Sequence, residues 1–570
     1  MKTVLATLNA KYIHTSLALR WLYVANKDHF DIDFIEYTLK EDAEIIINEL
    51  LQTQSDILGF SVSIWNVEKT ATLIKQLKKK NPKLIILIGG PEVSYDPEYF
   101  LTNWPIDYVI SGEGEFVLGE LLTEIEANRV PYIDGVSSKN HINKQVVQAD
   151  INRLITLDSP YQLERDKMEL KHRMIYFETS RGCPYQCQYC LSSLEKGVRY
   201  FPPNYIQDNL KYFIEQECKQ IKFLDRTFNL NKKHTEFVFE FLINHYRPNL
   251  SCQFEVYADI LSEELIAYLN QTLPENYFRF EIGIQSTYEP TNLAVKRKQD
   301  FEVLAKNVKL LIDGGKIDLH LDLIAGLPYE SYTRFIQSFN DVFQLKAKEL
   351  QLGFLKLLRG TNLRKQATKY GYIYQEKAPY EVIKNNDISA VELDKIRLAE
   401  FALEKLWNSN RFSRTMEHVF SEYYKGRFYE FFYTFGVYYQ NQKLPQFGYQ
   451  LEELYQSVHL FLLSENINVL PLLRTDYYQN FNIRPRGFWE SEFTKEEKKQ
   501  IYYQIGQDKE FLRRYKLTRK IVEKQMSIDR IDKDKYLLTR FGTKRNKTDI
   551  HPTYVYQFQH KEIGNELRDE

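Results

Sequence analysis

Met174-Ile-Tyr-Phe177, followed closely by Cys183-Pro-Tyr-Gln-Cys187-Gln-Tyr-Cys190, is the stretch that decides the fold. The apolar run predicts a buried strand, and the three cysteines fall in the loop after it. Thiolates are soft ligands that select iron–sulfur clusters, zinc or copper. No fourth cysteine follows until Cys218, so one coordination position is left for a group other than protein. An open position is typical of a catalytic rather than a structural metal site.

A zinc site is the alternative interpretation of the same loop. The three cysteines would then be three of four tetrahedral ligands, and a histidine, Cys218 or Cys252 would complete the set. In that case the protein could be a non-catalytic zinc-binding protein.

The composition is that of an ordinary globular chain in a reducing compartment. The 570 residues carry a formal net charge of −1, and 43% of them are apolar. Only five cysteines occur, three of them clustered, which favours metal binding over disulfides. Neither a membrane-spanning apolar run nor a signal peptide is evident, so we expect a cytoplasmic protein without a membrane span. The length predicts roughly three or four domains.

The first 130 residues predict a doubly wound parallel α/β sheet. Short β-branched runs at 3–8, 32–37, 57–63, 84–88 and 108–110 alternate with helical segments such as 67–80. Ligands of such sheets bind at the carboxyl ends of the strands. Those ends carry small and polar residues, namely Ser61, Ser63, Gly89, Gly90, Pro91, Gly112 and Glu113. The Gly112-x-Gly114 pair is not a dinucleotide fingerprint, because it lacks a third glycine and follows the last strand.

Residues 131–172 predict a linker with turn signals, and residues 173–365 predict six further βα units. We expect strands at 173–179, 220–224, 252–257, 278–284, 317–324 and 349–357, with helices such as 205–216, 263–270 and 301–314 between them. Six units fall short of the eight in a closed barrel. The pattern predicts a partial (β/α)6 barrel.

The CxxxCxxC loop follows the first of the six predicted strands. It resembles the cluster loop of the radical S-adenosylmethionine (SAM) enzymes. The resemblance implies that Cys183, Cys187 and Cys190 hold a [4Fe–4S] cluster and that SAM binds the fourth iron and is cleaved reductively. Residues at matching strand ends are implied in SAM binding: Tyr189, Glu255, Gln285, Ser286, Arg297 and Gly326. One departure follows the second strand, where many cobalamin-dependent relatives carry two acidic residues and this chain has Asp225-Arg226.

The first domain resembles the cobalamin-binding domain that precedes this barrel in class B methyltransferases. The resemblance implies that the seven strand-end residues named above contact the corrin. No Asp-x-His-x-x-Gly motif is present, so the lower face of the cobalt is expected to be free of a protein ligand, unless His14 in the loop after the first strand approaches it.

Residues 379–570 predict a mainly helical domain that resembles an uncharacterised accessory domain attached to this core. A helix is expected at 397–408, next to an aromatic cluster that begins at Arg427 and is interpreted mainly as core. Residues 513–547 carry 13 Lys or Arg against 4 Asp or Glu, and with interleaved Tyr and Phe they could bind RNA.

The leading hypothesis from sequence is therefore a cobalamin-dependent radical SAM enzyme that methylates an unactivated carbon of a small-molecule or lipid-like substrate. A flavodoxin-type or ferredoxin-type electron donor is implied as its partner. A cyclase or rearrangement enzyme of the same architecture, an RNA-modifying enzyme and a zinc-binding protein are the alternatives. The sequence assigns no catalytic residue.

Overall fold

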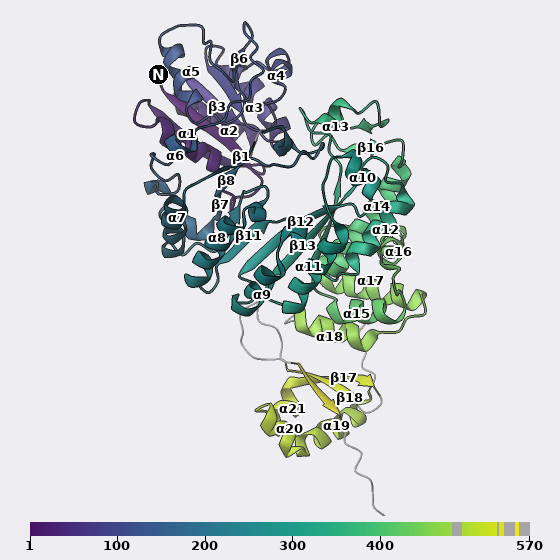
Figure 1. Ribbon diagram of the computed structural model, residues 1–570. Helices are drawn as coiled ribbons and strands as arrows, with labels where there is room; N and C mark the ends of the chain where they lie inside the picture. Colours follow the sequence, from purple (N-terminus) through teal and green to yellow (C-terminus); the bar gives the residue numbers. More distant parts are fainter. Residues whose placement is uncertain (196, 481–492, 533–534, 541–552, 558–570) are drawn as a thin grey trace, which may run out of the picture. The chain divides into compact units, whose positions relative to one another are not determined.

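The computed structural model describes residues 1–570 except 196, 481–492, 533–534, 541–552 and 558–570 (Figure 1). The chain divides into two compact units, Met1–Asp394 and Lys395–Glu570. The first contains two parallel sheets and the second is mainly helical, which confirms the predicted fold classes. Among the described residues, no helix combines the length and the apolar character that crossing a membrane requires.

The N-terminal sheet has six strands in the order β2-β1-β3-β4-β5-β6. The first five are parallel, and β6 pairs antiparallel with β5. Their bounds are β1 Thr3–Asn9, β2 Ile32–Thr38, β3 Ile57–Ser61, β4 Ile85–Gly89, β5 Tyr108–Ile110 and β6 Val136–Ser138. The order reverses between β1 and β3, which is the place where doubly wound sheets bind ligands.

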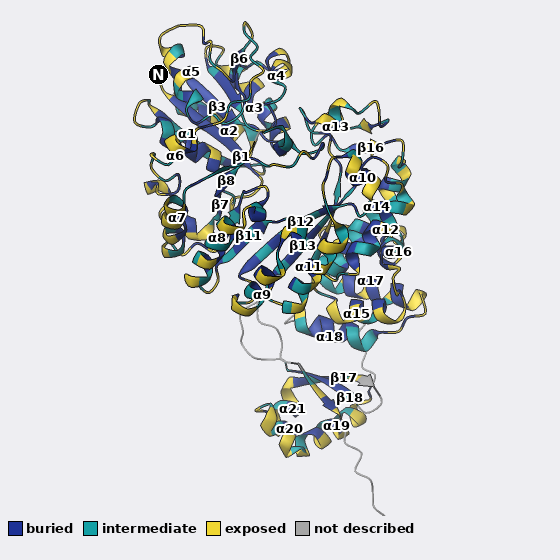
Figure 2. Cartoon of the chain, viewed as in Figure 1, coloured by how far each residue is buried: buried dark blue, intermediate teal, exposed yellow. Residues whose placement is uncertain are grey.

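Helices cover both faces of this sheet. Their bounds are α1 Leu17–Asn26, α2 Ala43–Gln52, α3 Val67–Lys80, α4 Pro97–Asn103 and α5 Val117–Glu126. Apolar residues of α2, α3 and α4 form one core with the strands. Helices α1 and α5 contact each other and contribute no residue to that core. The strands are largely dark blue in Figure 2, since most of their residues are buried. Ser16 and Asp42 cap α1 and α2 with side-chain oxygens, which satisfies the free N–H groups there.

The segment predicted as a linker contributes to the sheet domain. Besides β6 it holds the short helix α6, Ile151–Leu154, and two 3-10 turns, Glu164–Asp166 and Leu170–His172. Val147 forms a parallel bridge with Gly112, so part of the segment lies over the carboxyl end of β5.

The second sheet is the partial barrel. Its parallel strands follow one another in the order β14-β13-β12-β11-β10-β7, with bounds β7 Met174–Phe177, β10 Gln220–Phe223, β11 Ser251–Glu255, β12 Phe278–Gln285, β13 Asp318–Ala325 and β14 Glu349–Phe354. The connecting helices are α7 Pro203–Glu215, α8 Lys232–Asn244, α9 Glu263–Thr272, α10 Glu289–Ala294, α11 Phe301–Gly314 and α12 Tyr332–Phe343.

Alternation along the barrel strands separates an apolar face from a polar one. Phe254 and Phe280 are fully buried and pack on Phe239 of α8, so this face meets the helices. The alternate residues are half-buried and charged. Arg279 and Glu349 pair at 2.6 Å and Lys222 and Glu281 at 3.0 Å, so the inner face is held by ion pairs.

The last part of the first unit is a short extension of the barrel. It comprises α13 Asn362–Lys365 and the paired strands β15 Ile373–Tyr374 and β16 Val382–Lys384.

The second unit begins within α14, Ala390–Leu403, which continues as a π-helical turn, Glu404–Asn408. Further helices are α15 Ser413–Glu422, α16 Phe428–Asn441, α17 Leu451–Ser464, α18 Leu470–Asn480, α19 Lys495–Gln507, α20 Lys509–Arg514 and α21 Arg519–Gln525. Six aromatic residues of α16 are buried, as expected of core side chains.

A small antiparallel sheet, absent from our prediction, closes this unit. It consists of β17 Met526–Asp532, β18 Lys535–Arg540 and β19 Thr553–Gln557 in that order. Positions 533–534 and 541–547 of the predicted basic stretch lie outside the described residues.

Candidate active site

The cysteine loop begins and ends on a small hairpin. After β7 the chain forms β8, Ser180–Arg181, which pairs antiparallel with β9, Arg199–Tyr200. Gly182 has a φ of +92°, and a Cβ there would lie 2.2 Å from the carbonyl oxygen of Gly197. Only glycine permits this close approach, so the two ends of the loop are held together.

A buried carboxylate fixes the start of the loop. Asp225 follows β10 and is 1% exposed. It accepts hydrogen bonds from the backbone N–H of Thr179 at 3.0 Å and from the hydroxyls of Thr179 and Ser180 at 2.6 Å. These bonds join the carboxyl end of β7 to that of β10, next to the start of the cysteine loop.

The three cysteines are free thiols that lie close to one another. Cys187 is buried and Cys183 and Cys190 are half-buried. Burial raises the pKa of Cys183 and of Cys187, and the neighbouring thiols raise the pKa of Cys183 further. A metal that binds these groups as thiolates would therefore have to displace their protons.

Arg297, which follows α10, lies against the cysteine loop. Its guanidinium lies 4.0 Å from the Cys187 sulfur and 3.4 Å from the Tyr189 hydroxyl. It also donates to the carbonyl of Gly283 and lies over the ring of Tyr257. A fixed positive charge at this place favours the thiolate of Cys187, and it offsets part of the effect of burial on its pKa.

The remaining residues implied in SAM binding lie at strand ends of the barrel. Gln285 ends β12 at a register shift, with a φ of +70°, and its side-chain carbonyl is buried without a hydrogen-bond partner among the described residues. Glu255, at the end of β11, lies near the guanidinium of Arg226.

Two of the implied residues are engaged in internal contacts. Ser286 is fully buried, and its hydroxyl donates to Glu330 at 2.6 Å. The carbonyl of Gly326 accepts hydrogen bonds from Tyr372 and Asn385, both at 3.0 Å. Their roles in SAM binding stay predictions.

A cavity of about 1090 Å3 opens at the carboxyl ends of the N-terminal strands. Six of the seven residues predicted to contact corrin line it: Ser61, Gly89, Gly90, Pro91, Gly112 and Glu113. Ser63 is not among the lining residues, and its backbone N–H donates to the side chain of Asn66 at 2.8 Å. His14 is also absent from the lining, because its ring contacts the hydroxyl of Tyr176 at 2.8 Å.

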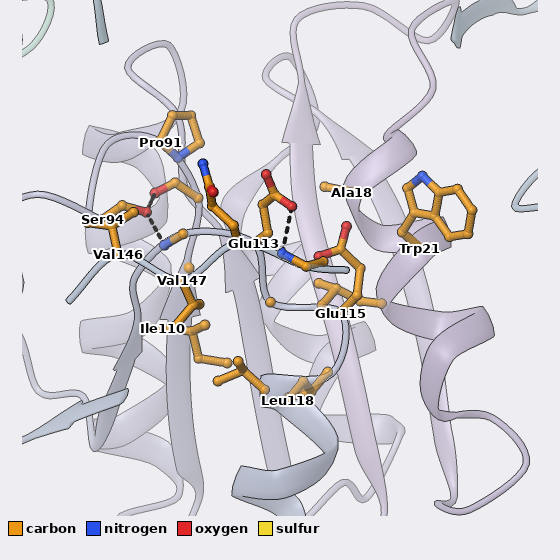
Figure 3. Close-up of a pocket in the computed structure, with 18 of the residues that line it drawn as sticks. Ala18, Trp21, Pro91, Ser94, Ile110, Glu113, Glu115, Leu118, Val146 and Val147 are labelled. Atoms are coloured by element: carbon orange, nitrogen blue, oxygen red, sulfur yellow. Dashed lines mark hydrogen bonds between the residues drawn. The ribbon is translucent and has the colours of Figure 1, made fainter. Parts of the chain in front are cut away.

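The wall of this cavity is closed by a segment that sequence reasoning missed. The backbone N–H of Gly112 donates to the hydroxyl of Ser94 at 3.0 Å, and Val146 and Val147 lie on the same side of the cavity as Ser94 (Figure 3). The backbone N–H of Glu113 donates to the carbonyl of Val147 at 3.0 Å. Residues 131–172 have only weak periodicity, so their sequence did not indicate that this stretch returns to the edge of the sheet.

Carboxylates and arginines meet where the cavity reaches the barrel. Arg181 pairs with Glu113 and Glu115, both at 2.8 Å, and with Glu178 at 2.6 Å. Arg199 also pairs with Glu113. Burial would raise the pKa of Glu113, but the two arginines outweigh this effect and lower it. These pairs attach the sheet domain to the hairpin of the cysteine loop.

Glu115 presents one free carboxylate oxygen in the cavity. The residue is 6% exposed, and Oε2 has no hydrogen-bond partner among the described residues. Burial raises its pKa, so its protonated form is favoured relative to an exposed glutamate. Because Oε1 pairs with Arg181, Oε2 is left to accept a hydrogen bond from an amide N–H of a bound molecule.

The barrel contributes to the same cavity. Glu178, Ser180, Arg181, Gly182, Leu191, Ser192, Leu194, Glu195, Leu224 and Arg226 are among the lining residues. The cavity is therefore continuous from the predicted corrin cradle to both flanks of the cysteine loop. None of the six residues implied in SAM binding lines it.

Within the described ranges, no group of three or more His, Cys, Asp or Glu side chains could hold a metal ion. A single zinc ion needs its thiolates to converge at about 2.3 Å from one point. A cluster separates its thiolate ligands by its own iron atoms, so it does not require that convergence. Cys218 and Cys252, the distant cysteines of the zinc alternative, are both buried.

Three family models match successive parts of the chain. Residues 3–122 match the B12 binding domain, residues 177–342 match the radical SAM superfamily, and residues 368–551 match a protein family of unknown function, DUF4080. The chain thus contains, in succession, a B12-binding domain, a radical SAM domain and a domain of unknown function.

The curated relatives include methyltransferases and a cyclase. A 2-(S-pantetheinyl)-carbapenam-3-carboxylate methyltransferase of Streptantibioticus cattleyicolor is 29% identical over 199 residues, which are 32% of this chain and 29% of that protein. The cobalamin-dependent radical SAM methyltransferase TokK of Streptomyces tokunonensis is 28% identical over 32% of this chain and 29% of its own. An anaerobic magnesium-protoporphyrin IX monomethyl ester cyclase of Synechocystis is 29% identical over 20% and 24%. The match spans about a third of the length of these proteins.

Solved structures share the fold. The cobalamin-dependent SAM radical enzyme OxsB with aqua-cobalamin bound superposes with a TM-score of 0.60 at 15% identity, over 84% of this chain and 80% of that one. The radical SAM methyltransferase TsrM from Kitasatospora setae gives a TM-score of 0.54 at 18% identity, over 67% and 80%.

The residues present fit the cofactors that these families bind. Three neighbouring thiols without a fourth protein ligand suit a [4Fe–4S] cluster with one open iron. The large cavity at the strand ends, with the free carboxylate oxygen of Glu115, suits a corrin whose rim carries amides. The unpartnered carbonyl of Gln285 offers an acceptor at the barrel end where SAM is expected.

Proposed function

We propose that this protein is a cobalamin-dependent radical SAM enzyme that transfers a methyl group to an unactivated carbon of a small-molecule or lipid-like substrate. One observation carries the proposal. The cavity at the carboxyl ends of the B12-binding domain continues without a partition to the cysteine loop. A substrate in it would meet both cofactors.

The two sets of residues have distinct tasks. When bound, the cluster and SAM supply one-electron cleavage of SAM, and cobalamin supplies a carrier for the methyl group. Cys183, Cys187 and Cys190 would ligate the cluster. Gly89, Gly90, Gly112 and Glu115 would form the cradle of the corrin.

Ion pairs between the two domains hold the cradle at the cluster loop. Arg181 is 9% exposed at its side chain and contacts three carboxylates, two from the B12-binding domain and one from the barrel. Its guanidinium is thereby largely shielded from solvent at this junction. Because a buried charge that loses its partners is costly, the junction is expected to stay closed during turnover.

The experiment that tests the proposal is anaerobic reconstitution with iron, sulfide and hydroxocobalamin. We expect near four irons per chain and retained corrin, and a variant with all three loop cysteines changed to alanine should lose the iron. A matched control changes Cys218 and Cys252 to alanine and should keep it. Iron without corrin would refute the methyl-transfer part, and tightly bound zinc without iron uptake would refute the enzyme.

A cyclase or rearrangement enzyme is the second candidate, since two relatives are named as cyclases. Incubation with SAM labelled in its methyl group separates the two. Label in the product supports methyl transfer, whereas an unlabelled product with a new ring supports the alternative.

A low-potential electron donor of the flavodoxin or ferredoxin type is the proposed partner, in the cytoplasm. A surface groove of about 540 Å3 includes Gln188 of the cysteine loop, Lys296 and Lys369, and none of its nine lining residues is acidic. Flavodoxins and ferredoxins are acidic, so complementary charge would guide one to this groove. RNA modification has no structural observation in its favour among the described residues.

A further inference from the structure

Arg226 is an arginine in the cavity without a partner. It follows β10 and lines the cavity between the corrin cradle and the cysteine loop. No described residue forms an ion pair or a hydrogen bond with its guanidinium. The residue is exposed, because the cavity itself is open to solvent.

Hydrogen bonds fix the backbone around Arg226 and so the place from which its side chain extends. The preceding Asp225 is tied to Thr179 and Ser180 by three hydrogen bonds. The carbonyl of Arg226 accepts a hydrogen bond from the hydroxyl of Thr227 at 2.9 Å. With Asp225 directed into the barrel core, Arg226 is directed into the cavity.

The other two arginines of the cavity are engaged. Arg181 is paired with Glu113, Glu115 and Glu178. Arg153 lies over the ring of Phe116 at 3.8 Å. Arg226 is therefore the lining arginine, within the described part of the chain, that is left to recognise a ligand.

The surroundings of Arg226 are acidic but do not neutralise it. Glu255 and Glu195 are close enough to act on its pKa, together with Cys190 and Cys183, yet neither carboxylate lies within ion-pair distance. Burial raises the pKa of both Glu255 and Glu195, which favours their neutral forms. A guanidinium binds planar anions through two parallel hydrogen bonds, so a carboxylate or a phosphate suits it best.

We propose that Arg226 binds a carboxylate or phosphate group of the substrate and orients the substrate between the corrin cradle and the cluster loop. This inference deepens the proposed function and rests on it. It assigns the substrate to the class of anionic small molecules. Glu255 lies near Arg226, but none of the six predicted SAM residues lines this cavity, and this favours the substrate over SAM as the source of the anion.

Chemical labelling of the reconstituted holoenzyme with phenylglyoxal tests the proposal. The extent of Arg226 modification is followed by peptide mass spectrometry, with inorganic phosphate or succinate as the anion probe. At a probe concentration ten times its dissociation constant, labelling of Arg226 should slow by about tenfold. Arg181 serves as an internal control that stays unlabelled throughout, because its carboxylate partners shield it.

Separate samples distinguish the sources of the anion. Protection of Arg226 by SAM alone, or by the nucleotide phosphate of hydroxocobalamin alone, would overturn the proposal. An Arg226 that is unlabelled at the outset, or labelled equally fast with and without phosphate and succinate, would also overturn it.

Two variants separate binding from a structural role. Arg226→Gln should abolish binding of inorganic phosphate by calorimetry, whereas Arg226→Lys, which keeps the charge, should retain part of it. Arg153→Gln is the matched control and should bind phosphate as the native protein does. Loss of iron and corrin from both Arg226 variants would show a structural role and overturn the proposal. Absence of corrin from the native protein would instead count against the proposed function, and the labelling result would still stand.

Discussion

Gly112→Ala should open the wall of the corrin cradle. Gly112 has a φ of +98°, and a Cβ would lie 2.2 Å from the carbonyl oxygen and 2.6 Å from the nitrogen of Val147. Both contacts are with backbone, so the segment around Val147 must move. That movement breaks two hydrogen bonds, from Glu113 to Val147 at 3.0 Å and from Val147 to Ser111 at 3.1 Å.

The magnitude follows from these contacts. A non-glycine residue in this backbone region costs about 1–3 kcal/mol, and each lost hydrogen bond costs about 1 kcal/mol. A local destabilisation of about 3–5 kcal/mol corresponds to amide exchange faster by about 100- to 3000-fold, at 1.4 kcal/mol for each tenfold step.

Hydrogen–deuterium exchange of the peptide that contains Val147, followed by mass spectrometry, measures this change, and corrin retention after reconstitution measures its consequence. Gly315→Ala is the matched control, since Gly315 lies outside the cavity lining and also has a positive φ, of +65°, but its Cβ would have no atom within 4 Å. Exchange in the Gly112→Ala variant at the native rate, with corrin fully retained, would refute the reasoning.

Three further perturbations test other parts of the structure. Burial would lower the pKa of His320, but the carboxylates of Asp322 and Glu349 raise it to about 10. This stabilisation is therefore present in full below the unfolded pKa of 6.5 and is lost as the pH rises towards 10, by up to about 3 kcal/mol between pH 7 and 9.5. Urea unfolding should show this loss in the native protein and little of it in His320→Gln; equal pH dependence in both would contradict the assignment. Lys296→Glu combined with Lys369→Glu should slow SAM cleavage driven by flavodoxin and leave cleavage driven by a chemical reductant unchanged, and equal rates with both reductants would exclude the groove as the docking site. Glu115→Gln keeps a side-chain oxygen of the same reach that accepts hydrogen bonds, so it should retain corrin, whereas Glu115→Ala should retain less; identical corrin contents would show that the free carboxylate oxygen makes no contact with it.

The local pattern of the sequence was sufficient for the two parallel sheets. Strands at 3–8, 32–37 and 57–63 were predicted within a few residues of β1, β2 and β3, because buried parallel strands are continuous apolar runs. The small sheet β17–β18–β19 was missed, since β17 and β18 are partly charged and lie within the basic stretch 513–547.

Spacing along the chain also identified the cysteine loop and the strand ends. The carboxyl ends of parallel strands meet at one edge whatever the intervening helices contain, so residues as far apart as Ser61 and Glu113 could be assigned to one site.

Tertiary structure alone decided how the cavity is closed and what occupies its walls. The return of Val147 to Gly112 and the pairing of Arg181 with Glu113 join segments 35 and 68 residues apart. No periodicity encodes such contacts, because they depend on backbone and charge partners that only the folded chain brings together. The same is true of Arg226. In the sequence it was a departure from an acidic pair, and the structure shows it as an arginine without a partner in the cavity, because its neighbours' carboxylates are held just out of reach.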